Sequence, residues 1–218
     1  MKDVIDANNE LIVLVHGFGA KRAVMWPLAS RLRGSGFRVL TWNYPSLFAR
    51  IESHAKRLYE FLATQLSKET RFHIVAHSMG SIVTRAALNR SPLPNLGRLV
   101  LLAPPNGGSP VARLASMLIG GVVVPTRELS DRHSSYVNQL RGPSDLDVGI
   151  IAARYDILVP VGNTHLVGER VHETLFATHN SLLLSRTACS KTVRFLRTGN
   201  FEMPDSKSIS RNRGSAVS

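Results

Sequence analysis

The chain alternates short, almost entirely apolar runs with longer amphipathic segments, and this alternation restricts its fold more than any other feature. The runs predicted as strands are residues 11–15, 38–44, 72–76, 98–103 and 146–155, with a weaker one at residues 172–178. Strands that are apolar on both faces are typical of parallel sheets covered by helices on both sides. We therefore predict an α/β fold with a mostly parallel sheet and helices on both faces.

The amphipathic segments carry apolar residues at helical spacing. The clearest is residues 51–66, in which one face holds Ile51, Ala55, Leu58, Phe61, Leu62 and Leu66. Three further helices are predicted. One lies within residues 25–37 and ends at Gly34 or Gly36, one begins directly after Ser78, and one covers residues 181–196. The segment at residues 114–129 is unusually apolar, which fits either a core helix or a flap over a site.

The chain has the size of one domain. Its 218 residues, 44% of them hydrophobic, can bury a single good-sized core, and it contains no internal repeat and no interdomain linker. We expect one domain over residues 1–202. The polar tail at residues 203–218 lacks aromatic residues and is expected to be disordered.

The number of cysteines and the composition of the N-terminal residues indicate where the protein is located and whether it binds a metal. The lone Cys189 excludes an internal disulfide framework and a cysteine-rich zinc site. The first ten residues hold Asp3, Asp6 and Glu10, unlike a signal peptide, and no apolar stretch reaches the roughly 20 residues of a membrane span. We expect a cytoplasmic location. No histidine–carboxylate grouping has metal-ligand spacing, so no metal and no other cofactor is expected.

The formal net charge of +12 is spread along the chain and is not gathered in one basic run. No zinc finger, RNA-recognition signature or basic helix with interleaved aromatic residues is present, so no nucleic-acid partner is expected. A solvated basic surface explains the charge. Weak association with anionic membrane surfaces is the alternative.

Ser78 lies at the junction between a predicted strand, "FHIVA", and a predicted helix, "SIVTRAAL". Small residues, Ala76 and Gly80, stand two positions before and after it. A serine at such a junction serves either as a helix N-cap or as an exposed nucleophile on a sharp turn. The surrounding residues decide between the two interpretations.

Polar residues follow several other predicted strands, and the carboxyl ends of parallel strands are where chemistry collects in an open sheet. "HGFG" follows the first strand, Asp156 follows the strand at residues 146–155, and His179 follows the weak last strand. A serine, an acid and a histidine therefore follow separate strands, in the order Ser78, Asp156, His179. This is the chain order of the α/β-hydrolase triad.

Other acids compete with Asp156 for this position. Asp145 and Asp147 come before the apolar part of their strand, "VGIIAA", and are expected at the opposite edge of the sheet, while Asp131 lies in the variable region between residues 103 and 146. Asp156 is therefore the preferred acid.

Other histidines compete with His179. His165 falls within the segment after the acid, and His172 lies at or before the last strand. His16 and His77 are expected to shape loops, His77 by packing beside Ser78. His179 is therefore the preferred base.

Five segments, in order, resemble the α/β-hydrolase family. "VHGFG" resembles the oxyanion loop of lipases, "AHSMG" the nucleophile elbow with Ala76 in place of the usual first glycine, and "LAPPNGGSPVA" the segment after the next strand. "RYDILVP" and "HNSLLLS" resemble the acid and histidine segments. The resemblance covers nearly all of residues 10–200 and is to the compact lipases and carboxylesterases, which have no large cap domain.

The resemblance implies a role for each residue. Ser78 would be the nucleophile, His179 the general base and Asp156 the residue that orients the imidazole. The backbone N–H groups of Phe18 and Met79 would form the oxyanion hole. Phe18 and Met79, with Met25 and Trp26, would lie near an apolar acyl pocket, although Met25 and Trp26 also fit ordinary packing of the first helix.

We therefore expect a serine hydrolase that cleaves carboxylic esters, similar to lipases or carboxylesterases, through an acyl-enzyme on Ser78. Its partner would be a small-molecule or lipid ester. Another acyl-transfer or peptidase activity on the same fold is one alternative, because fold does not fix the substrate. A non-catalytic basic lipid-binding protein is the other.

Overall fold

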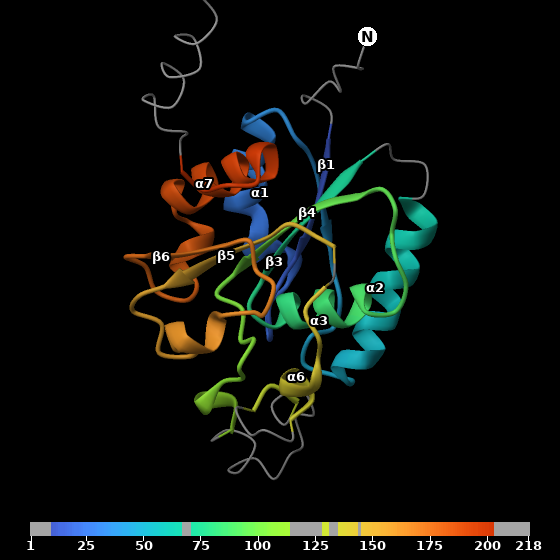
Figure 1. Ribbon diagram of the computed structural model, residues 1–218, viewed down its shortest axis with the longest axis vertical. Helices are drawn as coiled ribbons and strands as arrows, with labels where there is room; N and C mark the ends of the chain where they lie inside the picture. Colours follow the sequence, from blue (N-terminus) through green and yellow to red (C-terminus); the bar gives the residue numbers. More distant parts are fainter. Residues whose placement is uncertain (1–9, 67–70, 114–127, 131–134, 144, 203–218) are drawn as a thin grey trace, which may run out of the picture.

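A six-stranded parallel sheet forms the centre of the molecule (Figure 1). The computed structural model describes residues 10–66, 71–113, 128–130, 135–143 and 145–202. The strand order is β2-β1-β3-β4-β5-β6, and every neighbouring pair is parallel. The strands are β1 (Leu11–Val15), β2 (Arg38–Trp42), β3 (Phe72–His77), β4 (Leu96–Leu102), β5 (Val148–Ala153) and β6 (Val171–Leu175). The predicted parallel sheet is confirmed.

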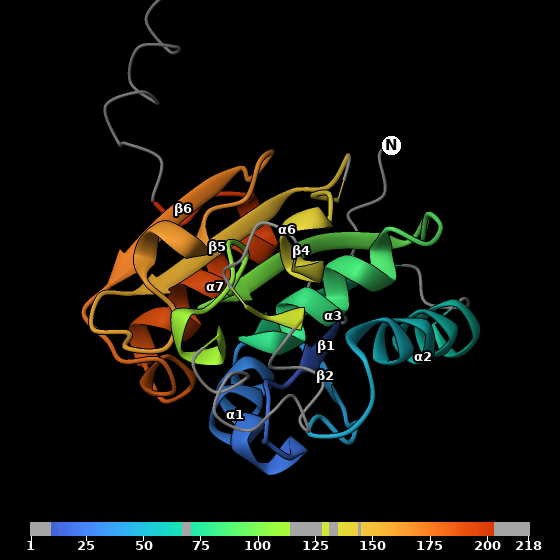
Figure 2. The same cartoon turned by 90° about the horizontal axis from the view of Figure 1, so that it is seen from below.

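Helices cover both faces of the sheet (Figures 1 and 2). One face is covered by α1 (Trp26–Gly34) and α7 (Arg186–Thr198), and the other by α2 (Ile51–Gln65) and α3 (Met79–Leu88). The described shorter segments are η1 (Arg22–Met25), α6 (Tyr136–Gln139), η2 (Val161–Thr164) and η3 (Ser181–Leu183). The prediction of flanking helices on both faces is confirmed.

Successive residues of each central strand pack into opposite cores, which explains why the strands are apolar throughout. In β1, Val13 packs into the core under α2 and α3, while Ile12 and Leu14 pack into the core under α1 and α7. These three side chains are fully buried. Burial of each contributes about 1.5–3 kcal/mol, so a polar substitution on either face is costly.

The C-terminal segment differs from the prediction of one continuous helix over residues 181–196. A single 3₁₀ turn, η3, comes first, and α7 begins only at Arg186. Ser185 lies between them as an N-cap, and its hydroxyl accepts a hydrogen bond from the N–H of Ala188 at 3.1 Å. This cap satisfies an N–H that the first helical turn would otherwise leave without a partner, so a new helix starts here.

Two points of the chain after β4 lie side by side, one at Ser109 and the other at Leu129 and Ser130. The N–H of Ser109 donates to the carbonyl of Leu129 at 2.8 Å, and Ser109 forms an isolated parallel bridge with Ser130. The helix or flap expected at residues 114–129 falls mainly on residues 114–127, which lie outside the described residues. The disordered tail expected at residues 203–218 also lies outside them. The division into one domain and a tail stays a prediction.

Helix α3 begins against the carboxyl end of β1, at a distance that only glycine allows. A Cβ atom on Gly80 would lie 2.5 Å from the carbonyl oxygen of His16 and 2.6 Å from that of Val15. Both neighbours are backbone atoms of a segment that starts in the central sheet, and they cannot move aside. Gly80 therefore fixes how closely the N-terminus of α3 approaches β1.

Replacing this glycine should destabilise the fold. We expect Gly80→Ala to lower the free energy of unfolding by about 1–3 kcal/mol, because the added methyl group overpacks a rigid backbone contact. The control is Gly34→Ala at the end of α1, where a Cβ would meet nothing within 4 Å. Gly34→Ala should be neutral or stabilising by up to about 1 kcal/mol. Urea unfolding of the three proteins measures the difference, and equal midpoints for both variants would contradict the prediction.

Candidate active site

The carboxyl ends of four strands meet at one edge of the sheet, and each is followed by a candidate residue. His16 follows β1, Ser78 follows β3, Asp156 lies three residues after β5, and His179 lies four residues after β6. Because all the strands are parallel, these segments lie at the same edge although they are far apart in the sequence.

Ser78 occupies a sharp turn between β3 and α3. Its φ of +54° and ψ of −130° lie outside the regions that non-glycine residues normally adopt. The turn is held by two backbone hydrogen bonds, from the N–H of Ser78 to the carbonyl of Leu102 and from the N–H of Ser81 to the carbonyl of Ser78, both 2.9 Å. Backbone strain of this kind persists where the surrounding structure enforces it, and it clusters at functional sites.

His179 connects Ser78 to Asp156. Its Nε2 atom lies 2.8 Å from the Oγ atom of Ser78, and its Nδ1 atom lies 2.6 Å from the Oδ2 atom of Asp156. A carboxylate can only accept, so Nδ1 donates to Asp156 and Nε2 is left as an acceptor for the Ser78 hydroxyl. The structure thus brings together the three residues that the sequence placed after separate strands.

Asp156 is held as a buried carboxylate. Its side chain is 1% exposed, and its Oδ1 atom accepts hydrogen bonds from the N–H groups of Leu158 and Val159, each 2.9 Å long. Burial alone would raise the pKa of this carboxyl. The hydrogen bond and charge of His179 and the two backbone N–H groups outweigh it, so that the pKa lies below its ordinary value. Asp156 is therefore ionised at neutral pH.

The two competing acids that the structure describes lie away from His179. Asp145 and Asp147 precede β5, at the opposite edge of the sheet. Asp147 is engaged by Arg98 at 3.1 Å and by Arg170 at 3.0 Å. Asp131 lies outside the described residues.

The competing histidines have other partners. His165 pairs with Glu169 at 2.7 Å and stacks on His172, with ring centroids 3.9 Å apart. His172 lies within β6, and its Nε2 atom is 2.7 Å from the hydroxyl of Thr164.

His77 packs against His179 and also bonds to it. Its Nε2–H donates to the backbone carbonyl of His179 at 3.1 Å, and the two ring centroids lie 4.9 Å apart. Burial, reinforced by the positive charge of a protonated His179, lowers the pKa of His77 to about 3. His77 is therefore neutral at ordinary pH and holds the main chain of His179 in place.

The loop after β1 passes directly over Ser78. A Cβ atom on Gly17 would lie 2.9 Å from the Cβ atom of Ser78, so only glycine fits. The hydroxyl of Tyr44, which follows β2, donates to the carbonyl of His16 at 2.9 Å, and the two rings stack with centroids 4.5 Å apart. Tyr44 thus fixes the backbone just before Phe18. The oxyanion role of the Phe18 and Met79 N–H groups stays a prediction.

Two of the four residues expected near an acyl pocket lie elsewhere. Met25 is fully buried in the core under α1, which agrees with the packing alternative, and Met79 is fully buried in the core under α2 and α3. Phe18 and Trp26 are exposed, by 39% and 67%.

Many of the large exposed apolar side chains lie in segments that follow the carboxyl ends of strands. Each lies between such a strand end and the early part of the helix that follows. They are Phe18, Val24, Trp26, Leu47, Phe48, Val111, Tyr155, Ile157, Phe176 and Leu184.

Among the residues that the structure describes, no group of three or more His, Cys, Asp or Glu side chains is placed to hold a metal ion. None of the helices in the described ranges has the length and apolar character needed to span a bilayer.

The buried state of His77 predicts a pH-dependent stability. Its pKa rises from about 3 in the folded protein to the ordinary 6.5 on unfolding, so the unfolded chain binds the extra proton between these values. Stability should therefore fall as the pH drops below about 6.5. We expect His77→Gln to flatten this fall by up to about 1.4 kcal/mol per pH unit, measured by urea unfolding between pH 6 and pH 4. Parallel profiles for the two proteins would contradict the prediction.

Comparison with known proteins identifies the family. A sequence search found no match among curated proteins. The mature lipase BlEst2 from Bacillus licheniformis superposes with a TM-score of 0.73 at 14% identity, covering 89% of this chain and 94% of that one. Aspergillus fumigatus lipase B superposes with a TM-score of 0.73 at 14% identity, covering 94% of this chain and 57% of that one. The ydeN gene product from B. subtilis superposes with a TM-score of 0.65 at 17% identity, covering 87% of this chain and 99% of that one.

At these identities the structural matches show the fold alone. The sequence itself matches the model of the Alpha/beta hydrolase family over residues 12–187, a range that runs from β1 to the start of α7 and includes Ser78, Asp156 and His179. Because this match spans most of the chain and agrees with the sheet and its strand order, the chain belongs to the alpha/beta hydrolase family.

Proposed function

We propose that the protein is a serine hydrolase that cleaves carboxylic esters through an acyl-enzyme on Ser78. The observation that carries this proposal is the unbroken chain of hydrogen bonds from Ser78 through His179 to Asp156, at 2.8 Å and 2.6 Å. A serine hydroxyl is too weakly acidic to attack an ester at neutral pH without a base in hydrogen-bond reach. His179 is within that reach.

In the first half of the reaction, the Oγ atom of Ser78 attacks the acyl carbon while its proton passes to Nε2 of His179. The tetrahedral intermediate then collapses, the bond to the alcohol oxygen breaks, and His179 returns the proton to the departing alcohol. Asp156 accepts from Nδ1 throughout, which keeps the correct tautomer and stabilises the imidazolium.

In the second half, water attacks the acyl-enzyme and gives its proton to His179. The bond between Oγ and the acyl carbon breaks, Ser78 regains its proton, and the carboxylic acid is released. Each step uses only groups of this chain, the substrate and water, so the proposed mechanism needs no cofactor.

The negative charge of the tetrahedral intermediate needs donors aimed at it in advance. We assign this role to the backbone N–H groups of Met79 and Phe18. Met79 is the first residue of α3, so the positive end of the helix dipole adds to its N–H. The contact of Gly17 with Ser78 and the bond of Tyr44 to His16 support the placement of Phe18. One such donor is typically worth about 3 kcal/mol of barrier.

The exposed apolar side chains in the segments that follow the strand ends favour esters with an apolar acyl group, as in lipases or carboxylesterases. The structural neighbours described as lipases agree with this substrate class. Basic side chains from the same edge, Lys21, Arg22, Arg50 and Arg154, are exposed. They would favour weak association with anionic lipid surfaces, although a solvated basic surface also accounts for them.

Two other activities remain as alternatives. The same triad can attack an amide or transfer the acyl group to an acceptor other than water. A non-catalytic lipid-binding protein would not need a hydrogen-bonded serine on a strained turn. Labelling of Ser78 by a fluorophosphonate separates the catalytic alternatives from the non-catalytic one.

Removing the nucleophile should abolish turnover. We expect Ser78→Ala to lower kcat on p-nitrophenyl esters by at least about 10⁴-fold, because the acyl-enzyme cannot form. The control is Ser190→Ala, which removes an exposed hydroxyl on α7 and should leave activity unchanged. A series of esters from short to long acyl chains gives the preferred substrate. Near-normal activity in folded Ser78→Ala protein would overturn the proposal.

Replacing Asp156 should impair the orientation of the His179 imidazole without impairing substrate binding. Asn at position 156 keeps the size of Asp but favours the wrong imidazole tautomer, so Asp156→Asn should lower kcat by about 10⁴-fold with little change in KM. The matched control, Asp145→Asn, lies at the opposite edge of the sheet and should be nearly silent. A large loss in Asp145→Asn together with a small one in Asp156→Asn would show that the acid is wrongly assigned.

A further inference from the structure

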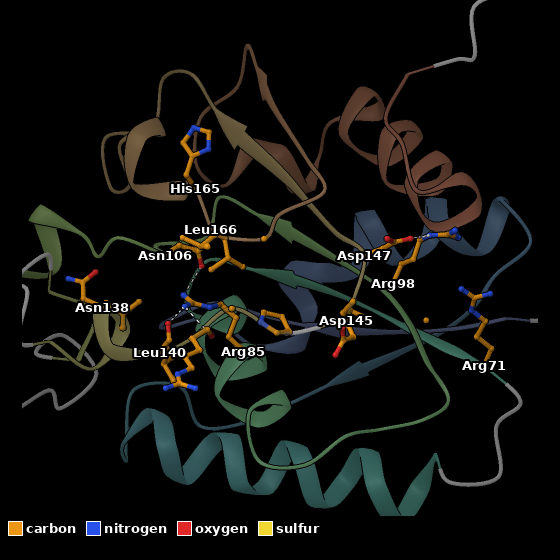
Figure 3. A pocket seen from close by; sticks show the side chains of 18 residues that line it. Arg71, Arg85, Arg98, Asn106, Asn138, Leu140, Asp145, Asp147, His165 and Leu166 are labelled. Atoms are coloured by element: carbon orange, nitrogen blue, oxygen red, sulfur yellow. Dashed lines mark hydrogen bonds and ion pairs between the residues drawn. The ribbon is translucent and has the colours of Figure 1, made fainter. Parts of the chain in front are cut away.

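A cavity of about 960 Å³ lies beside α3, on the side of α6 and of the loop between β5 and β6 (Figure 3). None of Ser78, Asp156 or His179 lines it. Arg85, which does line it, lies seven residues after Ser78 on α3, or roughly 10 Å along the helix. The cavity is therefore separate from the candidate active site.

Arg85 is a buried cation held by neutral groups. Its side chain is 2% exposed; it donates to the Oδ1 atom of Asn106 at 2.9 Å and to the carbonyl of Leu140 at 2.6 Å, with a longer contact to the carbonyl of Arg141 at 3.5 Å. Figure 3 shows the guanidinium lying between Asn106 and Leu140. Its Nε atom is buried without a hydrogen-bond partner. Among the described residues, no carboxylate pairs with it.

A buried charge without an opposite charge is unfavourable, and carbonyl dipoles offset only part of the cost. Burial lowers the pKa of Arg85 to about 10, which still leaves the guanidinium charged at neutral pH. An anion in the cavity would supply the missing opposite charge. A guanidinium is suited to this role because its N–H groups match the two oxygens of a carboxylate.

The other charged groups lining the cavity leave it positive. Arg71, Arg98 and Arg141 also line it, against Asp145 and Asp147. Arg71 lies 3.8 Å from Glu10, and His165, which also lines the cavity, pairs with Glu169 at 2.7 Å. Asp147 is already engaged by Arg98 and by Arg170. The surplus of basic groups would attract an anion from solution towards Arg85.

Apolar side chains also line the cavity, among them Val137, Leu140, Leu146 and Leu166, beside the amides of Asn106 and Asn138. The volume is that of a small-molecule site, and the four apolar side chains could contact an apolar chain. Arg85 is the one arginine of the lining that is buried and free of acidic partners within the described residues, which suits a ligand with one negative charge. We propose that this cavity binds a carboxylate that carries a short apolar chain, with Arg85 as its charged partner.

Octanoate is the probe for this site. We expect it to bind the full-length protein saturably and with one-to-one stoichiometry, as measured by isothermal titration calorimetry. Arg85→Gln should weaken its affinity at least about tenfold, the loss expected for a charged hydrogen bond. The matched control, Arg57→Gln, removes an exposed charge on α2 and should leave the affinity unchanged.

A second variant guards against misfolding, because Arg85 also joins α3 to two loops. Leu166→Trp narrows the cavity from the loop between β5 and β6 and removes none of the hydrogen bonds of Arg85. It should also weaken octanoate binding at least about tenfold. Circular dichroism establishes that each variant is folded, and if Arg85→Gln is not, the result for Leu166→Trp decides.

Two further ligands test the chemistry. 1-Octanol has the chain without the charge, and inorganic phosphate has the charge without the chain; both should bind at least about tenfold more weakly than octanoate. The proposal is overturned if wild type does not bind octanoate, if folded Arg85→Gln or Leu166→Trp binds it as well as wild type, or if either comparison ligand binds as tightly. None of these results depends on esterase activity.

Discussion

Burial of the central strands on both faces is the constraint on which the rest of the structure depends. Every residue of β1, β3 and β5 is buried. Such strands have no exposed face on which polar chemistry could be placed, so their functional groups must follow the strand ends. The parallel arrangement brings those ends to one edge, where Ser78, Asp156 and His179 meet although they are up to 101 residues apart.

Precise placement at that edge comes from the backbone more than from the side chains that react. Gly80 lets α3 approach β1, and this approach fixes the turn that carries Ser78. His77 holds the main chain of His179, and Tyr44 holds that of His16. The first bond joins the end of β3 to the segment after β6, and the second joins the segments after β1 and β2, so the rigidity of the sheet is passed on to the loops.

The sheet and the three candidate residues could be predicted because they depend on local patterns: apolar runs, the small residues around Ser78, and the order of polar residues after strands. The roles of Tyr44, His77 and Arg85 could not, because they depend on which distant segments meet. The sequence places His77 beside Ser78 but does not show its contact with His179, and the other two signals are a tyrosine at the end of the second predicted strand and an arginine within an apolar helix. The break at Ser185 was missed because apolar spacing continues across it while the N-cap hydrogen bond ends the pattern.

The meeting of Ser109 with Leu129 and Ser130 also bears on how such a protein could be redesigned. Ser109 and Leu129, the two ends of the chain segment between them, are already joined by a backbone hydrogen bond. The entropic cost of closing a loop grows only slowly with its length. Replacing the segment between Ser109 and Leu129 with a longer or shorter one would therefore change the free energy of folding little. Asp156 would keep its place, because its loop is tied independently through Asn163 to Gly107 and through Thr164 to Asn106. The junction is therefore a natural point at which a replacement segment could be joined while the reacting groups stay fixed.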